Sequence, residues 1–178
     1  MKEKIIILGA GESGVGAALL AKQKQYDVLV SDSGKISELY KRELELNEIE
    51  FEEGHIEGKI LQADVIIKSP GIAENELIKR IRAKGIEIIS EIEFGYRYKG
   101  DSKIIGITGS NGKSTTTALI HHICKTAGLS CALVGNIGYS FARQIAEASP
   151  PAPDPITIVS NSSIIIKFQK GHLMNIMK

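Results

Sequence analysis

Two glycine-rich loops carry most of the chemistry that the sequence offers. In the sharper one, an apolar run at residues 103–108 leads into Gly109-Ser-Asn-Gly-Lys-Ser114 and then into a helical pattern. Successive backbone amides of such a loop can wrap a polyphosphate, while Lys113 reaches the terminal phosphates and the Ser114 hydroxyl can ligate Mg²⁺. A strict phosphate-loop spacing would place glycine where this chain has Ile107. The segment therefore predicts an ATP-binding loop that differs from that of a generic GTPase.

The other loop, residues 9–14, has the pattern G-x-G-x-x-G between an apolar run and a helical pattern. Its glycines permit a tight turn and a close approach of helix to strand, and the helix amides can meet an anion. Asp32 ends the next apolar run, where a carboxylate can accept hydrogen bonds from ribose hydroxyls. Taken alone, this pattern is compatible with two interpretations: an NAD or FAD enzyme, or a strand–turn–helix that binds no ligand.

A third candidate site segment, Ser69-Pro70-Gly71, directly follows the third strand expected in the chain. This position is the carboxyl edge of the sheet, where open α/β sheets bind ligands. A plain turn is the alternative interpretation, because proline and glycine favour turns for purely local reasons.

Apolar runs of strand length alternate with helical patterns through most of the chain, which predicts parallel sheets covered by helices. The strands are expected at residues 4–8, 28–32, 64–69, 87–90, 103–108 and 132–134. The helices are expected at residues 14–24, 36–47, 75–84, 92–98, 113–127 and 139–148.

A charged stretch at residues 97–103 divides the pattern near Gly100 into two α/β units. We expect a Rossmann-like parallel-sheet domain over residues 1–99, followed by an incomplete phosphate-loop (P-loop) α/β ATPase domain that starts at residues 100–148. Residues 149–178 hold four of the five prolines and, beyond Asp154, no acidic residue, which predicts a divergent tail. Two apolar runs in this tail, 156–159 and 164–168, have the length of strands.

The composition narrows the class of protein. Hydrophobic residues make up 43% and charged residues 24%, which is typical of a soluble globular protein. The 22 Lys and Arg balance 21 Asp and Glu, so no overall field attracts nucleic acid or an anionic membrane. Cys124 and Cys131 form neither a disulfide framework nor a zinc spacing. The apolar run at residues 5–8 is too short for a signal or membrane segment, so we expect a cytoplasmic protein, and the sequence does not indicate an oligomeric state.

Taken in order, the motifs resemble those of the Mur ligase family. Residues 107–115 resemble its ATP loop, and Asn111 is typical of the member that adds D-glutamate rather than of the one that adds L-alanine. Further blocks that resemble the family lie at residues 9–14, 32–33, 69–72, 85–93 and 135–138. The resemblance covers residues 4–147.

This resemblance implies a ligase of peptidoglycan synthesis that uses ATP and Mg²⁺. It would phosphorylate the carboxylate of UDP-N-acetylmuramoyl-L-alanine and join it to D-glutamate as an amide. By motif position, the residues that contact the UDP-substrate would be Glu12, Ser13, Asp32, Ser33, Ser69, Gly71 and Asn136. The ATP-binding residues would be Gly109, Ser110, Asn111, Gly112, Lys113, Ser114 and Thr115, of which Lys113 and Ser114 are expected to be catalytic and Ser114 to ligate the metal.

After about Glu147 the sequence departs from the family pattern. The segment at residues 159–163 corresponds to a place where the family has a metal-binding acid, but it contains none. The family also has a third domain, which these 178 residues do not include. We therefore expect the polypeptide alone to lack ligase activity. A non-catalytic UDP-sugar or nucleotide-binding module and an NAD-binding oxidoreductase domain remain as alternatives.

Overall fold

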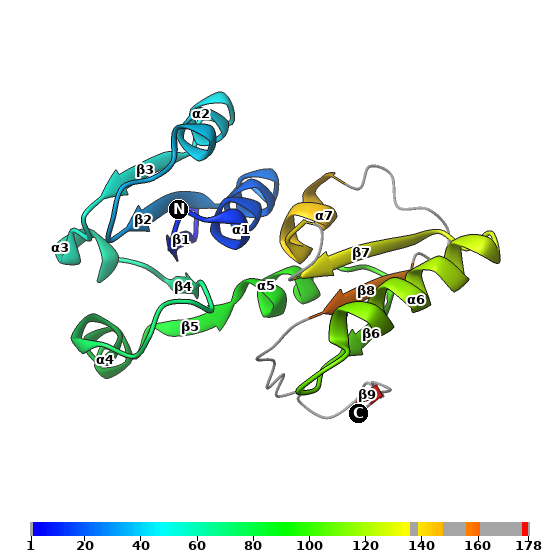
Figure 1. Ribbon diagram of the computed structural model, residues 1–178. Coiled ribbons are helices and arrows are strands. Elements are labelled where there is room, and N and C mark those ends of the chain that lie inside the picture. The colour runs from blue at the N-terminus through cyan, green and yellow to red at the C-terminus, as the bar shows by residue number, and fades with distance from the viewer. Residues whose placement is uncertain (1, 136–138, 148–155, 161–175, 178) are drawn as a thin grey trace.

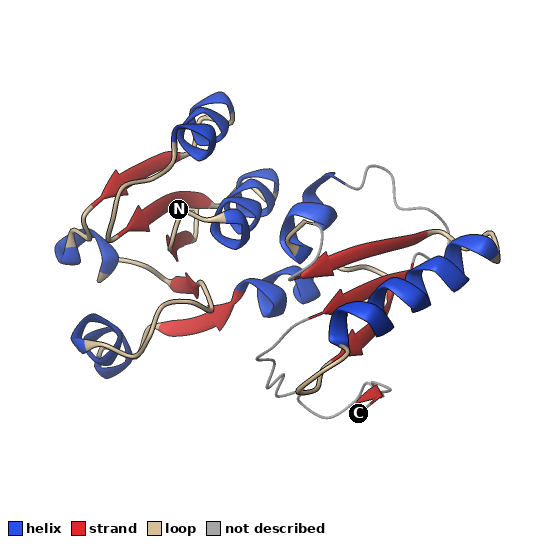
Figure 2. Ribbon diagram, viewed as in Figure 1, coloured by secondary structure: helices blue, strands red, loops and turns tan. Residues whose placement is uncertain are grey.

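The chain folds into two parallel sheets with helices packed against them (Figure 1). The computed structural model describes residues 2–135, 139–147, 156–160 and 176–177. Helices and strands alternate along most of this length (Figure 2). The predicted α/β class with parallel sheets is therefore confirmed.

The first sheet contains five strands in the order β3-β2-β1-β4-β5, and every neighbouring pair is parallel. The strands are β1 (Lys4–Leu8), β2 (Asp27–Asp32), β3 (Glu50–Glu53), β4 (Val65–Lys68) and β5 (Glu87–Ser90). The strand order reverses between β1 and β4, and ligands of open α/β sheets bind in the crevice outside the carboxyl ends of the strands at such a point. The loops that follow β1 and β4 therefore lie where a ligand of this sheet is expected to bind.

Helices cover both faces of this first sheet. They are α1 (Glu12–Gln23), α2 (Glu38–Leu46), α3 (Glu57–Ile60), α4 (Glu76–Ala83) and α5 (Glu91–Arg97). Side chains along β1 alternate between two cores: Ile5 and Ile7 pack with α1, whereas Ile6 and Leu8 pack on the α4 side. This alternation follows from the period of two residues in a strand. None of the helices in the described part of the chain is long and apolar enough to span a membrane.

The second sheet has the strand order β7-β8-β6-β9 and is also parallel. Its strands are β6 (Lys103–Ile107), β7 (Cys131–Gly135), β8 (Ile156–Ser160) and β9 (Ile176–Met177), and α6 (Lys113–Thr126) packs against it. The strand predicted at residues 156–159 is confirmed as β8, which lies between β6 and β7. The strand predicted at residues 164–168 falls outside the described residues.

The predicted strands and helices that lie within the described residues are confirmed within a few residues at their ends, but β3 and α3 were not predicted. Strand β3 has the sequence Glu-Phe-Glu-Glu, and its buried side chain is Glu52. A buried carboxylate interrupts the apolar pattern by which a strand is recognised from sequence. The short helix α3 has four residues, too few for a helical period to show.

Helix α7 (Phe141–Glu147) follows β7 in the chain, yet it packs against α1 and α5 of the first unit (Figure 1). Two glycines permit this approach. A Cβ atom on Gly16 would lie 1.9 Å from the Ser140 hydroxyl, and one on Gly95 would lie 2.9 Å from the Phe141 ring. Helix α7 thus joins the two units through a close contact.

Glu91 is buried where α5 meets this helix. Its carboxylate accepts a hydrogen bond from the backbone amide of Ala142, 2.5 Å away, in the first turn of α7. A carboxylate is favoured at a helix N-terminus, but burial opposes its ionisation and raises the pKa of Glu91 to about 7. This contact between the two units therefore contains a group that titrates near neutral pH.

The substitution Gly16→Ala should weaken the docking of α7. The added methyl group meets Ser140 and Arg143, so one helix must shift, at a cost of about 1–3 kcal/mol in the free energy of unfolding. Urea denaturation followed by circular dichroism measures this loss. Gly58→Ala on α3 is the matched control, since no atom lies within 4 Å of its added Cβ, and an unchanged midpoint for Gly16→Ala would contradict the close contact.

Glu91→Gln should change how stability depends on pH. Because the folded-state pKa of about 7 exceeds the ordinary value of 4.5, the stability that Glu91 contributes is full below pH 4.5 and is lost as pH rises through 7. Glutamine stays neutral, so between pH 4.5 and 7 the wild type should lose about 2–3 kcal/mol relative to the variant. Denaturant unfolding of both proteins across this range checks the difference, and parallel pH profiles would refute it.

Candidate functional site

The loop at residues 9–14 lies at the carboxyl end of β1 and leads into α1 at Glu12. Gly9 has φ +98°, a left-handed conformation that favours glycine, and a Cβ atom on Gly14 would lie 1.8 Å from the Gly9 carbonyl oxygen. The N-cap residue Gly11 supplies no side chain to the first-turn amides of α1. Because these amides have no acceptor within the helix, they can bind an anion.

Asp32 and Ser69 come from neighbouring strand ends and lie beside this loop. The Asp32 carboxylate accepts hydrogen bonds from the backbone amides of Ala10, at 2.7 Å, and Gly34, at 2.9 Å. The Ser69 hydroxyl lies against the loop, 2.7 Å from the position that a Cβ atom on Gly9 would occupy. The structure therefore brings these two predicted residues together at one edge of the sheet.

The other residues predicted to contact the UDP-substrate differ in their burial and in the direction of their side chains. Ser13 is half-buried at the start of α1, and Ser33 and Gly71 are exposed in the loops that follow β2 and β4. Asn136 lies outside the described residues. Glu12 was also expected to contact the UDP-substrate, but its carboxylate points to α7, where it accepts hydrogen bonds from the backbone amide of Ser140 and from an arginine.

That arginine is Arg143, whose side chain is 6% exposed. Its Nε and Nη2 atoms donate to the two Glu12 carboxylate oxygens at 2.8 and 3.2 Å. The same guanidinium group also donates to both carboxylate oxygens of Glu43 on α2. Hydrogen bonds to Glu43 and Glu12 raise the pKa of Arg143 above its usual range, so the side chain stays charged. Sequence reasoning missed this residue, because a single arginine in a helical pattern is typical of an exposed surface.

Two further groups of polar side chains stabilise the strand ends next to this site. Neither group belongs to a sequence motif, so neither was predicted. Lys68 donates from Nζ to the carbonyl oxygens of Ser69, at 3.3 Å, and Ile72, at 2.6 Å, which fixes the turn after β4. The buried Ser31 hydroxyl is 2.9 Å from Glu52 Oε1 and 2.8 Å from His55 Nδ1. This network holds the end of β2, next to Asp32.

The second glycine loop lies at the carboxyl end of β6. Gly109 and Gly112 have φ values of +148° and +74°, and α6 begins directly after Gly112. The Lys113 ammonium group donates to the backbone carbonyls of Gly109 and Ser110. Buried Thr117 donates from its hydroxyl to the Lys113 carbonyl oxygen at 2.6 Å, which fixes the first turn of the helix. The remaining predicted ATP-binding residues are exposed: Ser110, Asn111, Ser114 and Thr115.

The donor set for a metal ion in this loop is sparse. The described ranges contain no group of three or more His, Cys, Asp or Glu side chains that could hold a metal. Ser114 offers one exposed hydroxyl, and Mg²⁺ commonly completes its octahedron with nucleotide phosphates and water. Ser114 is therefore compatible with a Mg²⁺ ion that a bound nucleotide carries, but not with a metal site built by side chains of this loop alone.

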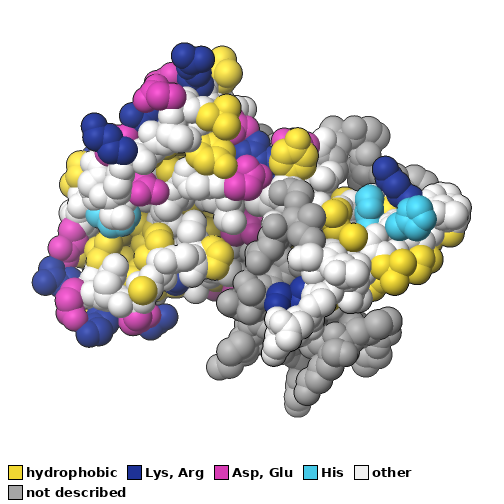
Figure 3. Space-filling view, viewed as in Figure 1, with side chains coloured by type: hydrophobic (Ala, Val, Ile, Leu, Met, Phe, Trp, Pro, Cys, Tyr) yellow, Lys and Arg dark blue, Asp and Glu magenta, His cyan; other side chains and the backbone are white. Residues whose placement is uncertain are grey.

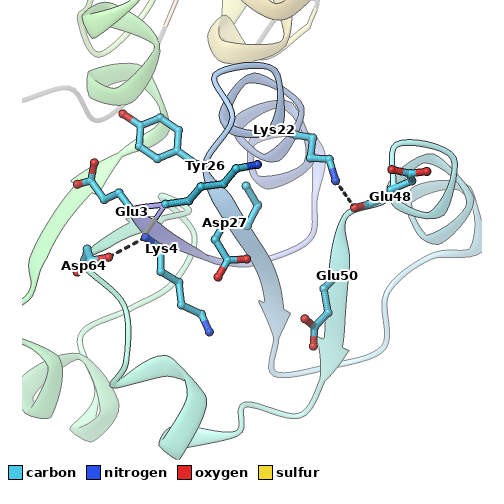
Figure 4. Close-up of a pocket in the computed structure, with 10 residues that line it drawn as sticks. Glu3, Lys4, Lys22, Tyr26, Asp27, Glu48, Glu50 and Asp64 are labelled. Atoms are coloured by element: carbon cyan, nitrogen blue, oxygen red, sulfur yellow. Dashed lines mark hydrogen bonds between the residues drawn. The ribbon is translucent and has the colours of Figure 1, made fainter.

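A large hollow lies elsewhere on the described part of the chain. It has a volume of about 1010 Å³ and is lined by residues at the amino ends of the first-sheet strands, among them Lys4, Asp27 and Asp64 (Figure 4). Both glycine loops lie at the carboxyl ends of their sheets, so the hollow does not coincide with the predicted sites. Basic and acidic side chains are interspersed over the visible face of the first unit (Figure 3), so that face carries no uniform patch for nucleic acid.

Two family descriptions match the sequence of the chain. The MurD N-terminal domain matches residues 4–77, and the Mur ligase middle domain matches residues 107–167. The second match continues 20 residues beyond Glu147, where we expected the resemblance to end, and it includes β8.

Curated relatives named UDP-N-acetylmuramoylalanine–D-glutamate ligase have similar sequences. The protein from Cytophaga hutchinsonii is 59% identical over 148 residues, which are 82% of this chain and 33% of the relative. The protein from Bacteroides fragilis is 56% identical over 147 residues, with the same two coverages, 82% and 33%. The protein from Porphyromonas gingivalis is 51% identical over 165 residues, which are 92% of this chain and 36% of the relative. The chain thus spans about a third of the length of these relatives.

Solved structures share the fold. A UDP-N-acetylmuramate:L-alanyl-gamma-D-glutamyl-meso-diaminopimelate ligase from Neisseria meningitides aligns with a TM-score of 0.60 and 21% identity, over 90% of this chain and 52% of that one. The UDP-N-acetylmuramate-alanine ligase from Thermotoga maritima aligns with a TM-score of 0.53 and 22% identity, over 88% and 36%. Because the two matched domains occur in sequence order and the fold agrees, the chain belongs to the Mur ligase family.

Proposed function

We propose that this chain forms the UDP-substrate-binding and ATP-binding part of a ligase that joins D-glutamate to UDP-N-acetylmuramoyl-L-alanine. The observation that carries the proposal is the pair of glycine loops, each at the carboxyl end of a parallel sheet and each leading into a helix. The sequence identity to the D-glutamate ligases supports the choice of substrate. A protein that uses ATP and a UDP-sugar is expected to work in the cytoplasm.

The first loop is the proposed site for the UDP group. Its helix amides suit the diphosphate, and Asp32, which already accepts a hydrogen bond from the Ala10 amide of the loop, would contact the ribose. Ser69 lies against Gly9 at the same edge. We assign Ser13, Ser33 and Gly71 to the same substrate, together with Asn136 by motif position.

The second loop is the proposed site for ATP, in a domain that we place from residue 100 onward. Lys113 would exchange its two carbonyl partners for phosphate oxygens, which are stronger acceptors because they are charged. In that position it neutralises charge that develops on the transferring phosphoryl group. A bound Mg²⁺ ion, with Ser114 as one ligand, would supply further neutralisation.

The proposed reaction proceeds in two steps that balance. The substrate carboxylate takes the γ-phosphoryl group of ATP, which leaves ADP and an acyl-phosphate. The amine of D-glutamate then forms the amide bond, loses a proton, and releases inorganic phosphate. Activation as a phosphate is needed because a carboxylate oxygen is a poor leaving group. In this proposal, residues of the two glycine loops and the neighbouring strand ends would serve substrate binding and phosphate neutralisation in the first step.

Asp32→Asn should weaken binding of UDP-N-acetylmuramoyl-L-alanine by about tenfold. The asparagine side chain has one acceptor oxygen, whereas the carboxylate serves the amides of Ala10 and Gly34 and, as proposed, a ribose hydroxyl. Isothermal titration calorimetry of the chain measures the affinity. Asp64→Asn is the matched control: Asp64 also accepts a hydrogen bond from a backbone amide at 2.7 Å, that of Lys4, but at the opposite edge of the sheet.

The same titration tests the assignment of the first loop. The wild-type chain should bind UDP-N-acetylmuramoyl-L-alanine more tightly than NADH. Tighter binding of NADH would favour the oxidoreductase alternative, and equal losses in the Asp32 and Asp64 variants would remove the proposed site from the first loop.

Lys113→Ala should reduce the affinity for MgATP at least about tenfold, since the loop loses its one ammonium contact to the phosphates. Lys125→Ala, on an exposed position of the same helix, should leave the affinity unchanged. Titration with a fluorescent ATP analogue distinguishes the two. Comparable affinities for both variants would contradict the proposed role of Lys113.

A further inference from the structure

Glu12 presents an electrostatic problem for the proposed UDP site. It is the first residue of α1, within the loop whose amides are proposed to meet the diphosphate. A carboxylate there stabilises the helix dipole, but a free carboxylate at this place would repel an anionic ligand. The site therefore needs a group that neutralises Glu12 and directs it away from the ligand.

Arg143 meets both requirements. It holds the Glu12 carboxylate through two donors, Nε and Nη2, and the Ser140 backbone amide donates to the same carboxylate at 3.1 Å. Because the guanidinium is planar and almost fully buried, these contacts fix the direction of the Glu12 side chain. Glu12 thus points to α7 and is paired.

The charges around Arg143 make its loss consequential. Its guanidinium group pairs with Glu12 and Glu43, and Glu147 Oε1 lies 3.6 Å from Nη1. Glu12 is 35% exposed and Glu43 28% exposed, so neither is fully screened by solvent. Without the arginine, two carboxylates would face each other, and Glu12 would be free to turn toward the loop.

We propose that Arg143 is a positioning residue for the UDP-substrate, which keeps the first glycine loop receptive to a diphosphate by holding and neutralising Glu12. The inference rests on the proposed function of that loop. It also explains why the residue comes from α7, beyond the second glycine loop: the first site is complete only while α7 is docked on α1.

The test compares ligands that share the uridine group: one without phosphate and two with the diphosphate. The 178-residue chain and its Arg143→Met, Glu12→Gln and double variants are titrated with uridine, UDP and UDP-N-acetylmuramoyl-L-alanine by calorimetry. Arg143→Met should weaken both diphosphates about tenfold and uridine less than about twofold, because uridine carries no charge. Adding Glu12→Gln to Arg143→Met should restore the diphosphate affinities to within about threefold of the wild type, since it removes the repelling carboxylate.

A merely structural ion pair would behave differently. It would weaken uridine and UDP to the same extent, and the second substitution would not restore binding; either result overturns the proposal. Arg143→Lys keeps the charge on one ammonium group and should weaken UDP less than Arg143→Met does, which provides a milder variant if the methionine protein unfolds. Arg82→Met, which breaks the exposed Arg82–Glu74 pair on α4, is the control for loss of a surface arginine.

The outcomes for the two proposals can be separated. If the wild-type chain does not bind UDP-N-acetylmuramoyl-L-alanine, the proposed function of the loop fails, and this inference fails with it. If the wild type binds it and Arg143→Met binds UDP equally well, only the role of Arg143 is refuted.

Discussion

The contact between α7 and the first unit is the constraint on which the rest of the arrangement depends. Two carboxyl groups of the first unit, Glu12 and Glu91, accept hydrogen bonds from backbone amides at the start of α7. Arg143 of α7 in turn forms an ion pair with Glu12. Burying such groups is costly unless each finds its partner. The partners come from opposite sides of the contact, so these polar groups are satisfied only when the two units meet in this orientation.

This contact has a consequence for both glycine loops. Each loop lies at the carboxyl end of the strand before it, and that position follows from the parallel sheets alone. The position of one sheet relative to the other does not follow from either sheet. It is set where α7 packs between α1 and α5, with Gly16 and Gly95 allowing the close approach. In the proposed function, a reaction between ligands held in the two loops would depend on that spacing.

Structural features that depend on a repeated sequence pattern could be predicted, whereas features that depend on a single residue could not. Apolar periodicity predicted β1 and its neighbours, and glycine spacing predicted both loops, because these signals involve many residues at a time. Strand β3 was not predicted, because its buried residue is Glu52, a charged residue type whose side chain accepts a hydrogen bond from Ser31. The role of Arg143 was not predicted either, because its partner Glu12 lies 131 residues away in the sequence and only the folded chain brings the two together.

The two loops also differ in how ready they are for a ligand. In the first, Asp32 already holds the Ala10 amide and Ser69 packs against Gly9, so the backbone is ordered without a nucleotide. In the second, the Lys113 ammonium group donates hydrogen bonds to the carbonyls of Gly109 and Ser110, and the proposed polyphosphate would have to replace these contacts. Under the proposed function, part of the binding energy of ATP would be used to release Lys113, whereas the proposed ligand of the first loop would meet a backbone that is already ordered. Tight, selective binding is thus expected from the first loop, and a weaker, exchangeable interaction from the second.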